Sequence, residues 1–415
     1  MGRRYLWTDA HAVFALVGLH LAGFPPQGAA PEILAFEGLR PERAPSAPPG
    51  AGALDLAVAL ARSVHEVLGR FAPDDPRSGW ISGLSDRDGA RTPCVAGLRI
   101  GKPRLERAVA PDRTSAGGGT GGGTQVDPID DPAEWERDGQ YFHYLVKWMH
   151  ALDRLARATG DVAWCANGAA LARVACERFL LSDGRGPRLA WKMSVDLSRP
   201  VVDSSGLHDA LGGLVACLAL RDSMEGLARR SGRTIPGNWF EPEIALLSEI
   251  CAREGSWRTA DPLGAGELAL DLATLDRLAA GGCADAQAWR ARVADACASS
   301  LRAVPLDAIL AWPPSRRLAF RELGFALGVG ALADAGRTDG LAPRAVEAAA
   351  RIVADWSDPA ARTGPAWRAH EDIGDATLAA CLAPAAIVPR SLADAAAPAL
   401  SPPSARDRPR GCTGG

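Results

Sequence analysis

The chain has little excess of either charge and no long apolar run. It contains 46 Lys and Arg residues against 49 Asp and Glu residues, so its formal net charge is -3. A net charge this small gives no chain-wide positive field of the kind that holds nucleic acid or an anionic membrane. No stretch approaches the roughly 20 apolar residues that span a bilayer. We therefore expect neither nucleic acid nor a membrane as a partner.

Cysteines with metal-ligand or redox spacing are also lacking. The nine cysteines are scattered, none belongs to a Cys-x-x-Cys pair, and most lie within apolar stretches. An odd number with this distribution is typical of reduced thiols in the core of a protein from a reducing compartment. The sequence therefore predicts a cytoplasmic protein.

The N-terminus offers an alternative location. Arg3-Arg4, followed by the apolar run 12–23, resembles a signal peptide. However, Asp9, His11 and His20 place polar groups within or beside that run. This pattern favours a buried first helix, because an inner helix is apolar on nearly all sides.

Apolar residues recur at helical spacing along most of the chain. Several of these segments end at a glycine such as Gly160 or Gly336, which is typical of a helix C-terminus. Strand-like segments are short, at 97–100 and 189–195, and we expect hairpins there at the rim of the helical body. Helices are predicted at about 6–22, 53–70, 138–159, 162–181, 206–229, 241–254, 265–280, 285–303, 316–335, 342–357 and 372–383, with a twelfth near 385–396.

Two segments lack helical periodicity. Residues 24–50 are rich in Pro, Ala and Gly and are predicted to form an irregular connection. Residues 71–137 contain a glycine tract, which loses much entropy on ordering and buries no side chain. We expect a flexible insertion near 111–133, an ordered part at 80–105 over the site, and a disordered tail at 401–415.

About twelve helices in pairs are the number that an (α/α)6 barrel requires. Polar clusters that carry an acid or a histidine precede several of the apolar helical runs, as at Asp138 and His208. In a toroid of six hairpins, such helix starts converge on one pocket. The sequence therefore predicts an all-α, single-domain toroid over residues 1–400, with an irregular α-bundle or an α-solenoid as the alternative.

Six segments spread over nearly the whole chain carry a family resemblance: Arg4–Asp9, Gly79–Leu84, Gly97–Lys102, Asp138–Leu152, Trp191–Pro200 and His370–Ile373. Together they resemble an uncharacterised bacterial family of the six-hairpin glycosidase-like, (α/α)6 toroid type. The resemblance implies the fold. It leaves the reaction open, because toroids of this type include glycoside hydrolases, lyases and sugar epimerases.

Carboxylates at the predicted helix starts are candidates for catalysis. Glycoside hydrolysis needs one protonated acid and a second carboxylate that activates water or attacks the sugar. We expect Asp138 and Asp209 to be this pair, with Glu371 and Asp372 as reserves. The alternative for each is helix capping, worth about 1 kcal/mol. The full set is Asp9, Asp138, Asp209, Glu322, Glu371 and Asp372.

Histidines fall at three of the same helix starts, at positions 143, 208 and 370. An imidazole titrates near neutral pH and suits proton transfer beside a carbonyl. The alternative function is therefore a sugar epimerase or isomerase that uses His208 and His370, and a further alternative is a non-catalytic sugar-binding or scaffold protein. No close ligand spacing is present, so we expect no metal and no other cofactor.

Tryptophan outnumbers tyrosine by 12 to 3. Indole rings stack on the apolar faces of sugar rings, although core filling is the alternative for each. We expect Trp80, Trp191 and Trp367 to hold a sugar, and Lys192 and Arg99 to recognise an anionic substituent. The sequence thus predicts a glycoside hydrolase-like enzyme that acts on a small molecule or an oligosaccharide. Further candidates for binding are Trp7, Asp9, Gln140, Tyr141, His143 and Glu322.

Overall fold

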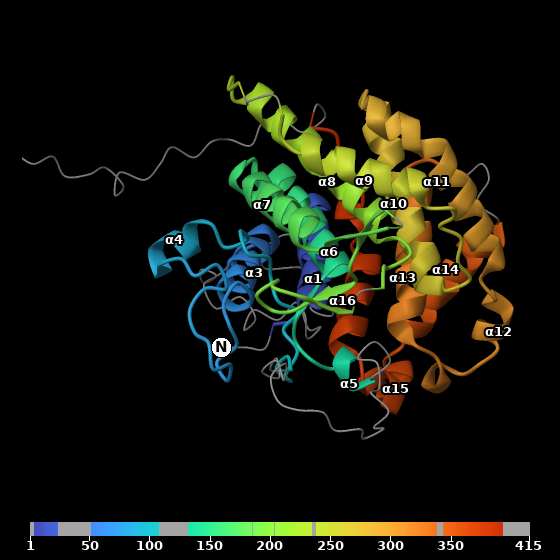
Figure 1. Cartoon of the computed structure of the whole chain (residues 1–415). Coiled ribbons are helices and arrows are strands. Elements are labelled where there is room, and N and C mark those ends of the chain that lie inside the picture. The colour runs from blue at the N-terminus through green and yellow to red at the C-terminus, as the bar shows by residue number, and fades with distance from the viewer. Residues whose placement is uncertain are drawn as a thin grey trace, which may run out of the picture.

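The computed structural model forms a mostly helical, all-α fold with two small antiparallel sheets (Figure 1). The prediction of a mostly helical chain is therefore confirmed. The connection 24–50, the tail 401–415 and all but the end of the insertion 111–133 lie outside the described residues. The structure describes residues 4–23, 51–107, 132–184, 186–202, 204–234, 238–337 and 343–392.

Six helices are buried on most sides. In the first, every residue from Leu6 to Leu19 is buried, as its nearly continuous apolar sequence requires. Each of the six packs against the next in chain order, and the sixth packs against the first. The finer prediction of an (α/α)6 toroid stays a prediction. The six are α1 (Leu6–Leu21), α6 (Phe142–Thr159), α8 (Asp209–Arg230), α10 (Pro262–Ala280), α13 (Ala319–Asp334) and α16 (Glu371–Leu382).

Five further helices cover the outside of these six. Along the last of them in chain order, the helix Pro343–Ser357, one face is buried and the opposite face is exposed. The buried face carries Ala345, Ala348, Ala349 and Ile352 at helical spacing. On α1, α6, α8, α10 and α13, respectively, pack α3 (Ala53–Leu68), α7 (Ala163–Arg178), α9 (Glu241–Arg253), α11 (Ala284–Ala303) and α14 (Pro343–Ser357).

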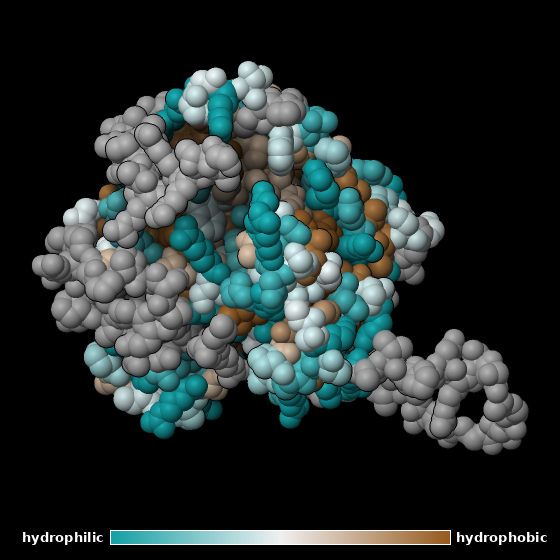
Figure 2. Space-filling view, turned by 90° about the vertical axis from the view of Figure 1, so that its left-hand side faces the viewer, coloured by the Kyte–Doolittle hydropathy of each residue, from teal (hydrophilic) through white to brown (hydrophobic). Residues whose placement is uncertain are grey.

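The molecule buries most of its large apolar side chains between these helices. On the face shown in Figure 2, hydrophilic side chains are interspersed with separate hydrophobic patches. Eight cysteines lie in the described part, all are free thiols, and six are buried, as predicted. In the same part of the chain, no helix has both the length and the apolar character needed to cross a membrane.

A three-stranded sheet fixes the start of α6. β1 (Gln140–Tyr141) pairs with β4 (Lys192–Met193), which pairs with β5 (Pro200–Val202). The backbone N–H of Phe142 also donates to Trp191 O at 3.3 Å. The sheet therefore places Trp191 beside the first turn of α6.

Short elements account for the main differences from the predicted pattern. The segment 97–100 is not a strand and takes part only in an isolated bridge, and residues 385–392 form no α-helix. The segment 189–195 is not one strand: it contains the last residue of β3, Leu189, and the two residues of β4. Besides β1 and β5, the unpredicted elements are β2 (Leu180–Asp183), β3 (Gly186–Leu189), α4 (Asp86–Arg91), α5 (Pro132–Trp135), α12 (Leu306–Leu310), α15 (Pro365–Arg368), η4 (Pro314–Arg316), η5 (Pro359–Thr363) and η6 (Pro384–Ala386).

Helices α10 and α13 touch through glycines. A Cβ atom on Gly266 would lie 2.2 Å from Gly324 O, and one on Gly328 would lie 2.1 Å from Gly266 O. No side chain fits at either position without separating the two helices. This contact therefore sets how closely α10 approaches its neighbour.

We expect Gly266→Ala to lower the free energy of unfolding by about 1–3 kcal/mol, because overpacking forces the backbones apart. Urea denaturation measures this change. The matched control is Gly330→Ala on α13, where a Cβ atom would meet nothing within 4 Å. Alanine there is expected to gain up to about 1 kcal/mol, since it restricts the unfolded chain. Equal stabilities of the two variants would contradict the close contact.

Candidate functional site

A cavity of about 230 Å³ lies at the N-terminal parts of four buried helices. Helix α1 contributes an indole ring, α6 an imidazole and an ammonium group, and α8 and α10 contribute carboxyl groups. Rings and acids that are distant in sequence therefore share one concave site. Its lining residues are Trp7, His143, Val146, Lys147, Trp191, Gly206, Leu207, His208, Asp209, Gly212, Asp261, Leu263, Gly264, Glu267 and Asp271.

A larger cavity, of about 450 Å³, lies at the opposite ends of α1, α6 and α10. Two of its arginines are already engaged. Arg154 pairs with Asp153 and donates to Ala386 O at 2.9 Å, and Arg157 pairs with Asp222 at 2.8 Å. Among the described residues, no carboxyl group lines this cavity. The smaller cavity is therefore the better candidate for acid–base chemistry.

Asp209 lies in the first turn of α8 and is 7 % exposed. Its Oδ2 atom has no hydrogen-bond partner among the described residues. Burial raises the pKa of Asp209 to about 7, against the lowering effect of a backbone hydrogen bond from Gly206, and Glu254 raises it further. A buried oxygen without a partner costs about 1–3 kcal/mol, which marks Asp209 as a group kept for a ligand or water.

Asp271 is the second buried acid of the cavity. Burial raises its pKa to about 8, and the charge of Glu267 raises it further, while Lys147 lowers it. Because they are four residues apart on α10, Glu267 and Asp271 lie on the same face of the helix. Asp271 is therefore largely protonated at neutral pH.

An ion pair between Lys147 of α6 and Glu267 of α10 spans the cavity. The Lys147 ammonium also lies 5.2 Å from the centre of the Trp7 ring. Burial lowers the pKa of His143 to about 3 and that of His11 to about 4, and the Lys147 charge lowers both further. Both imidazoles are therefore neutral, and Lys147 is the charged partner of Glu267 in the cavity.

Aromatic rings form one wall of the cavity. Trp191 is stacked on His143, with the ring centres 5.7 Å apart and the planes 10° apart. The Trp7 ring centre lies 5.9 Å from that of His143, and Tyr141, outside the cavity, lies 5.0 Å from Trp191. These rings come from three separate segments. They present flat apolar surface beside the carboxyl groups.

The raised pKa of Asp271 predicts a pH effect on stability. Below its ordinary pKa of 3.8, the group is protonated in both states. Between that value and about 8, only the unfolded chain ionises, so the stabilising contribution is progressively lost as pH rises. Asp271→Asn removes this titration. We expect the free energy of unfolding of the wild type, compared with that of the variant, to fall as pH rises through this range. The total fall is about 1.4 kcal/mol for each unit by which burial raises the pKa.

Urea denaturation at several pH values between 4 and 8 measures this difference. The control is Asp295→Asn on the exposed side of α11, whose stability should follow the wild type at every pH. Parallel curves for the wild type and Asp271→Asn would contradict the assignment of a buried, protonated Asp271.

The structure brings together five of the predicted site residues, which line the cavity: Trp7, His143, Trp191, His208 and Asp209.

Asp138, predicted as a catalytic acid, lies in a buried structural network instead. Its Oδ2 accepts from Arg99 Nη1 at 2.7 Å, and its Oδ1 accepts from the backbone N–H of Gly101 at 2.9 Å. Arg99 also donates to Arg70 O and Val67 O, so it is not available to an anionic substituent. Both side chains tie the 97–102 segment to the start of β1, and we assign them a structural role.

Lys192 and Gln140 are structural for the same reason. The Lys192 ammonium is fully buried and donates to Glu134 O at 2.7 Å and Arg137 O at 3.0 Å. Burial lowers its pKa to about 8. Gln140 Nε2 donates to Ala96 O and to Val195 O. Neither side chain lines the cavity, so the expected contact of Lys192 with an anionic group is not carried further.

Other predicted residues have packing partners outside the cavity. Asp9 pairs with Arg4, Glu322 pairs with Arg317, and Arg70 covers the ring of the buried Trp80. Trp367 stacks on Trp356, and His370 contacts Phe320.

Tyr141 packs behind Trp191 and does not line the cavity. Glu371 is exposed at the start of α16, and Asp372 accepts from the backbone N–H of Ile373.

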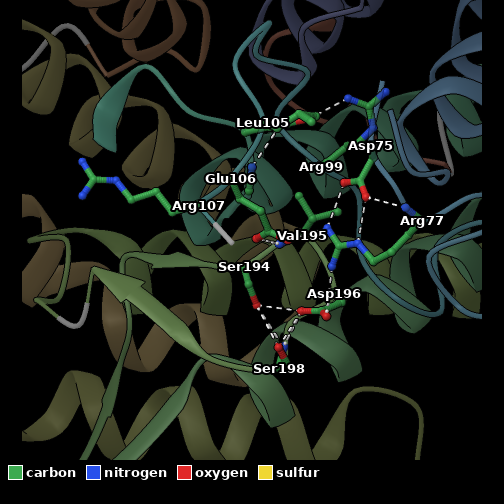
Figure 3. Close-up of polar contacts among 12 residues, drawn as sticks. Asp75, Arg77, Arg99, Leu105, Glu106, Arg107, Ser194, Val195, Asp196 and Ser198 are labelled. Atoms are coloured by element: carbon green, nitrogen blue, oxygen red, sulfur yellow. Dashed lines mark hydrogen bonds and ion pairs between the residues drawn. The ribbon is translucent and has the colours of Figure 1, made fainter. Parts of the chain in front are cut away.

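A polar network holds the 71–107 segment against the connection between β4 and β5 (Figure 3). Arg77 pairs with Asp75 at 2.9 Å, Glu106 at 2.5 Å and Asp196 at 3.2 Å. Glu106 also accepts from Val195 N at 2.8 Å. No residue of 80–105 lines the cavity, so the expectation that this segment lies over the site is not met.

Lys147, Glu267 and Asp271 also line the cavity, and they were not predicted as site residues. Lys147 follows the aromatic segment before α6, and Glu267 follows the glycine at the start of the predicted helix 265–280. The spacing of Glu267 and Asp271 could have indicated the site. Two carboxylates at positions i and i+4 of an otherwise apolar helix need a polar surrounding, which a cavity provides.

Comparison of the chain with family models, with curated proteins and with solved structures gives no match. Within the described ranges, no group of three or more His, Cys, Asp and Glu side chains has an arrangement suited to a metal ion.

Proposed function

We propose that the chain is a carbohydrate-active, glycoside hydrolase-like enzyme whose six buried helices form an (α/α)6 toroid. The contacts of each buried helix with the next, and of α16 with α1, support the toroid. The six segments that resemble the six-hairpin glycosidase-like family support the same fold. A cytoplasmic location and a sugar or oligosaccharide substrate are part of the proposal.

One observation carries the proposed reaction. Asp209 and Asp271 face the same cavity from neighbouring helices, and burial raises their pKa values to about 7 and about 8. Glycoside hydrolysis needs one carboxyl that donates a proton and one that accepts a proton near neutral pH. Environments that give two acids different pKa values assign these roles. The charge of Glu267, one helical turn away, favours the protonated form of Asp271, so we assign Asp271 as the acid and Asp209 as the base.

The reaction follows from this assignment. Asp271 gives its proton to the glycosidic oxygen as the bond from that oxygen to the anomeric carbon breaks. A water molecule attacks the same carbon, and Asp209 takes the proton that this water loses. Glu267, the ion-pair partner of Lys147, stabilises the positive charge that develops on the sugar ring. The Trp7 and Trp191 rings hold the apolar faces of the sugar.

The alternative epimerase needs two histidines that face one another. His208 lines the cavity, but its Nε2 atom is 2.8 Å from Trp257 O, and His370 packs on Phe320. Burial also lowers the pKa of His208. The carboxyl pair is therefore better placed for proton transfer than the histidine pair.

The test is a screen of purified protein against cello-, malto-, xylo- and chito-oligosaccharides. A substrate should raise the melting temperature, because it binds the native state only, and should release new reducing ends. A rise in melting temperature without any hydrolysis would favour the non-catalytic sugar-binding alternative. If no sugar raises the melting temperature and none is hydrolysed, the proposal is overturned.

A further inference from the structure

An exposed indole lies next to the candidate cavity. Trp135 is 40 % exposed, and its ring centre is 4.0 Å from that of Trp191, which lines the cavity. Trp191 in turn stacks on His143. Aromatic surface therefore continues from inside the cavity to the solvent. Leu207, which is 48 % exposed, also lines the cavity and adds further apolar surface there.

The backbone on both sides of Trp135 is fixed by a buried lysine. Lys192 Nζ donates to Glu134 O at 2.7 Å and to Arg137 O at 3.0 Å. The Glu134 carboxylate is buried and lies 3.6 Å from Lys192 Nζ and 3.2 Å from Arg107 Nε. Trp135 is thus an exposed ring on an anchored backbone. A ring that is positioned before binding loses little entropy when a ligand stacks on it.

Among the described residues, the charges near this ring are paired. Lys192 is buried against Glu134, and Lys147 is paired with Glu267. A neutral ligand with flat apolar faces therefore suits the surface better than a charged one. Sugar rings have such faces, and indole rings bind them by stacking.

We propose that Trp135 forms an outer sugar subsite, so that the substrate is a neutral oligosaccharide with at least one unit outside the cavity. The proposal rests on the proposed function for the nature of the ligand. It adds that chain length determines affinity, and that Trp135 is the residue responsible. The inner unit occupies the cavity that Trp7 and Trp191 line, and the next unit stacks on Trp135.

The experiment measures binding of cello-, malto-, xylo- and chito-oligosaccharides of one to six units by isothermal titration calorimetry. For the wild type, affinity should rise from the single sugar to the longer chains. Trp135→Ala should lose about tenfold in affinity for the longer chains and keep its affinity for the single sugar, whereas Trp135→Phe should retain most of the gain with length.

The matched control is Trp312→Ala. Trp312 is also exposed, at 49 %, but it lies beyond α12 with Arg316 over its ring and does not line the cavity. This variant should bind every sugar as the wild type does. Equal losses in both variants, or a Trp135→Ala loss that is the same for one unit and for six, would overturn the subsite.

The two proposals fail in different ways. Hydrolysis by the wild type and by Trp135→Ala at equal rates for all lengths would overturn the subsite and leave the hydrolase standing. Length-dependent binding through Trp135 without hydrolysis would leave the subsite and overturn the reaction. If no sugar of the series binds, both proposals are overturned.

Discussion

Asp209→Asn is expected to lower the rate of the proposed glycoside hydrolysis by about 10²–10⁴-fold, the usual contribution of a positioned acid or base. An amide has nearly the same shape as the carboxyl group, but it cannot accept the proton of the attacking water. Asp209 is in the first turn of α8 and its Oδ2 atom lacks a partner among the described residues, so little of the packing depends on its charge. Substrate binding should therefore change much less than the rate.

The pH profile distinguishes this role from a structural one. In the wild type, kcat/KM should rise as Asp209 ionises near pH 7 and fall as Asp271 loses its proton near pH 8. Asp209→Asn should lose the rising limb, and Asp271→Asn should lose the falling limb. Initial rates of reducing-end release between pH 5 and pH 9 measure both.

Asp295→Asn serves again as the control, because this aspartate is exposed on α11. It should keep the wild-type rate and profile. A profile for Asp209→Asn that keeps both limbs, at any rate, would remove Asp209 from the reaction.

The second large effect is expected for Asp138→Ala, which should lower the free energy of unfolding by about 3–5 kcal/mol. The variant leaves the Arg99 guanidinium buried without its carboxylate, and a lone buried charge is strongly destabilising. It also removes the acceptor of the backbone N–H of Gly101. Urea denaturation measures the loss.

The neighbouring Glu136→Ala is the control, because Glu136 forms an exposed ion pair with Arg104 at 2.7 Å. Such a pair contributes about 0–1 kcal/mol. The double variant Asp138→Ala/Arg99→Met should be less destabilised than Asp138→Ala alone, since it removes both charges. A stable Asp138→Ala protein that has lost hydrolysis would restore the catalytic role expected from the sequence.

The helices were predictable because their signal is local. A buried helix such as α1 has a nearly continuous apolar run after its first turns, and Gly160 ends α6 with a left-handed backbone conformation. The start of α6 was placed too early, at residue 138, because Gln140 and Tyr141 pair with β4 more than 50 residues away. Pairing over that separation leaves no pattern in the segment itself.

The same limit applies to the candidate site. Asp209 and His143 were predicted because they occur at helix starts, where reactive groups of a toroid gather. Asp138 has the same local appearance, but its partner Arg99 lies 39 residues earlier in the chain. Asp271 lies in the third turn of α10, so attention to helix starts alone does not find it.

The glycine contact between α10 and α13 also positions the two carboxyl groups that α10 contributes to the cavity. Gly266 directly precedes Glu267, and Asp271 follows one helical turn later. A substitution that widens the gap between the two helices would shift both carboxyl groups without altering any residue of the cavity. Under the proposed function, the reaction rate would change through substitutions at Gly324 or Gly328, and selection for that rate would preserve glycines that never meet the substrate.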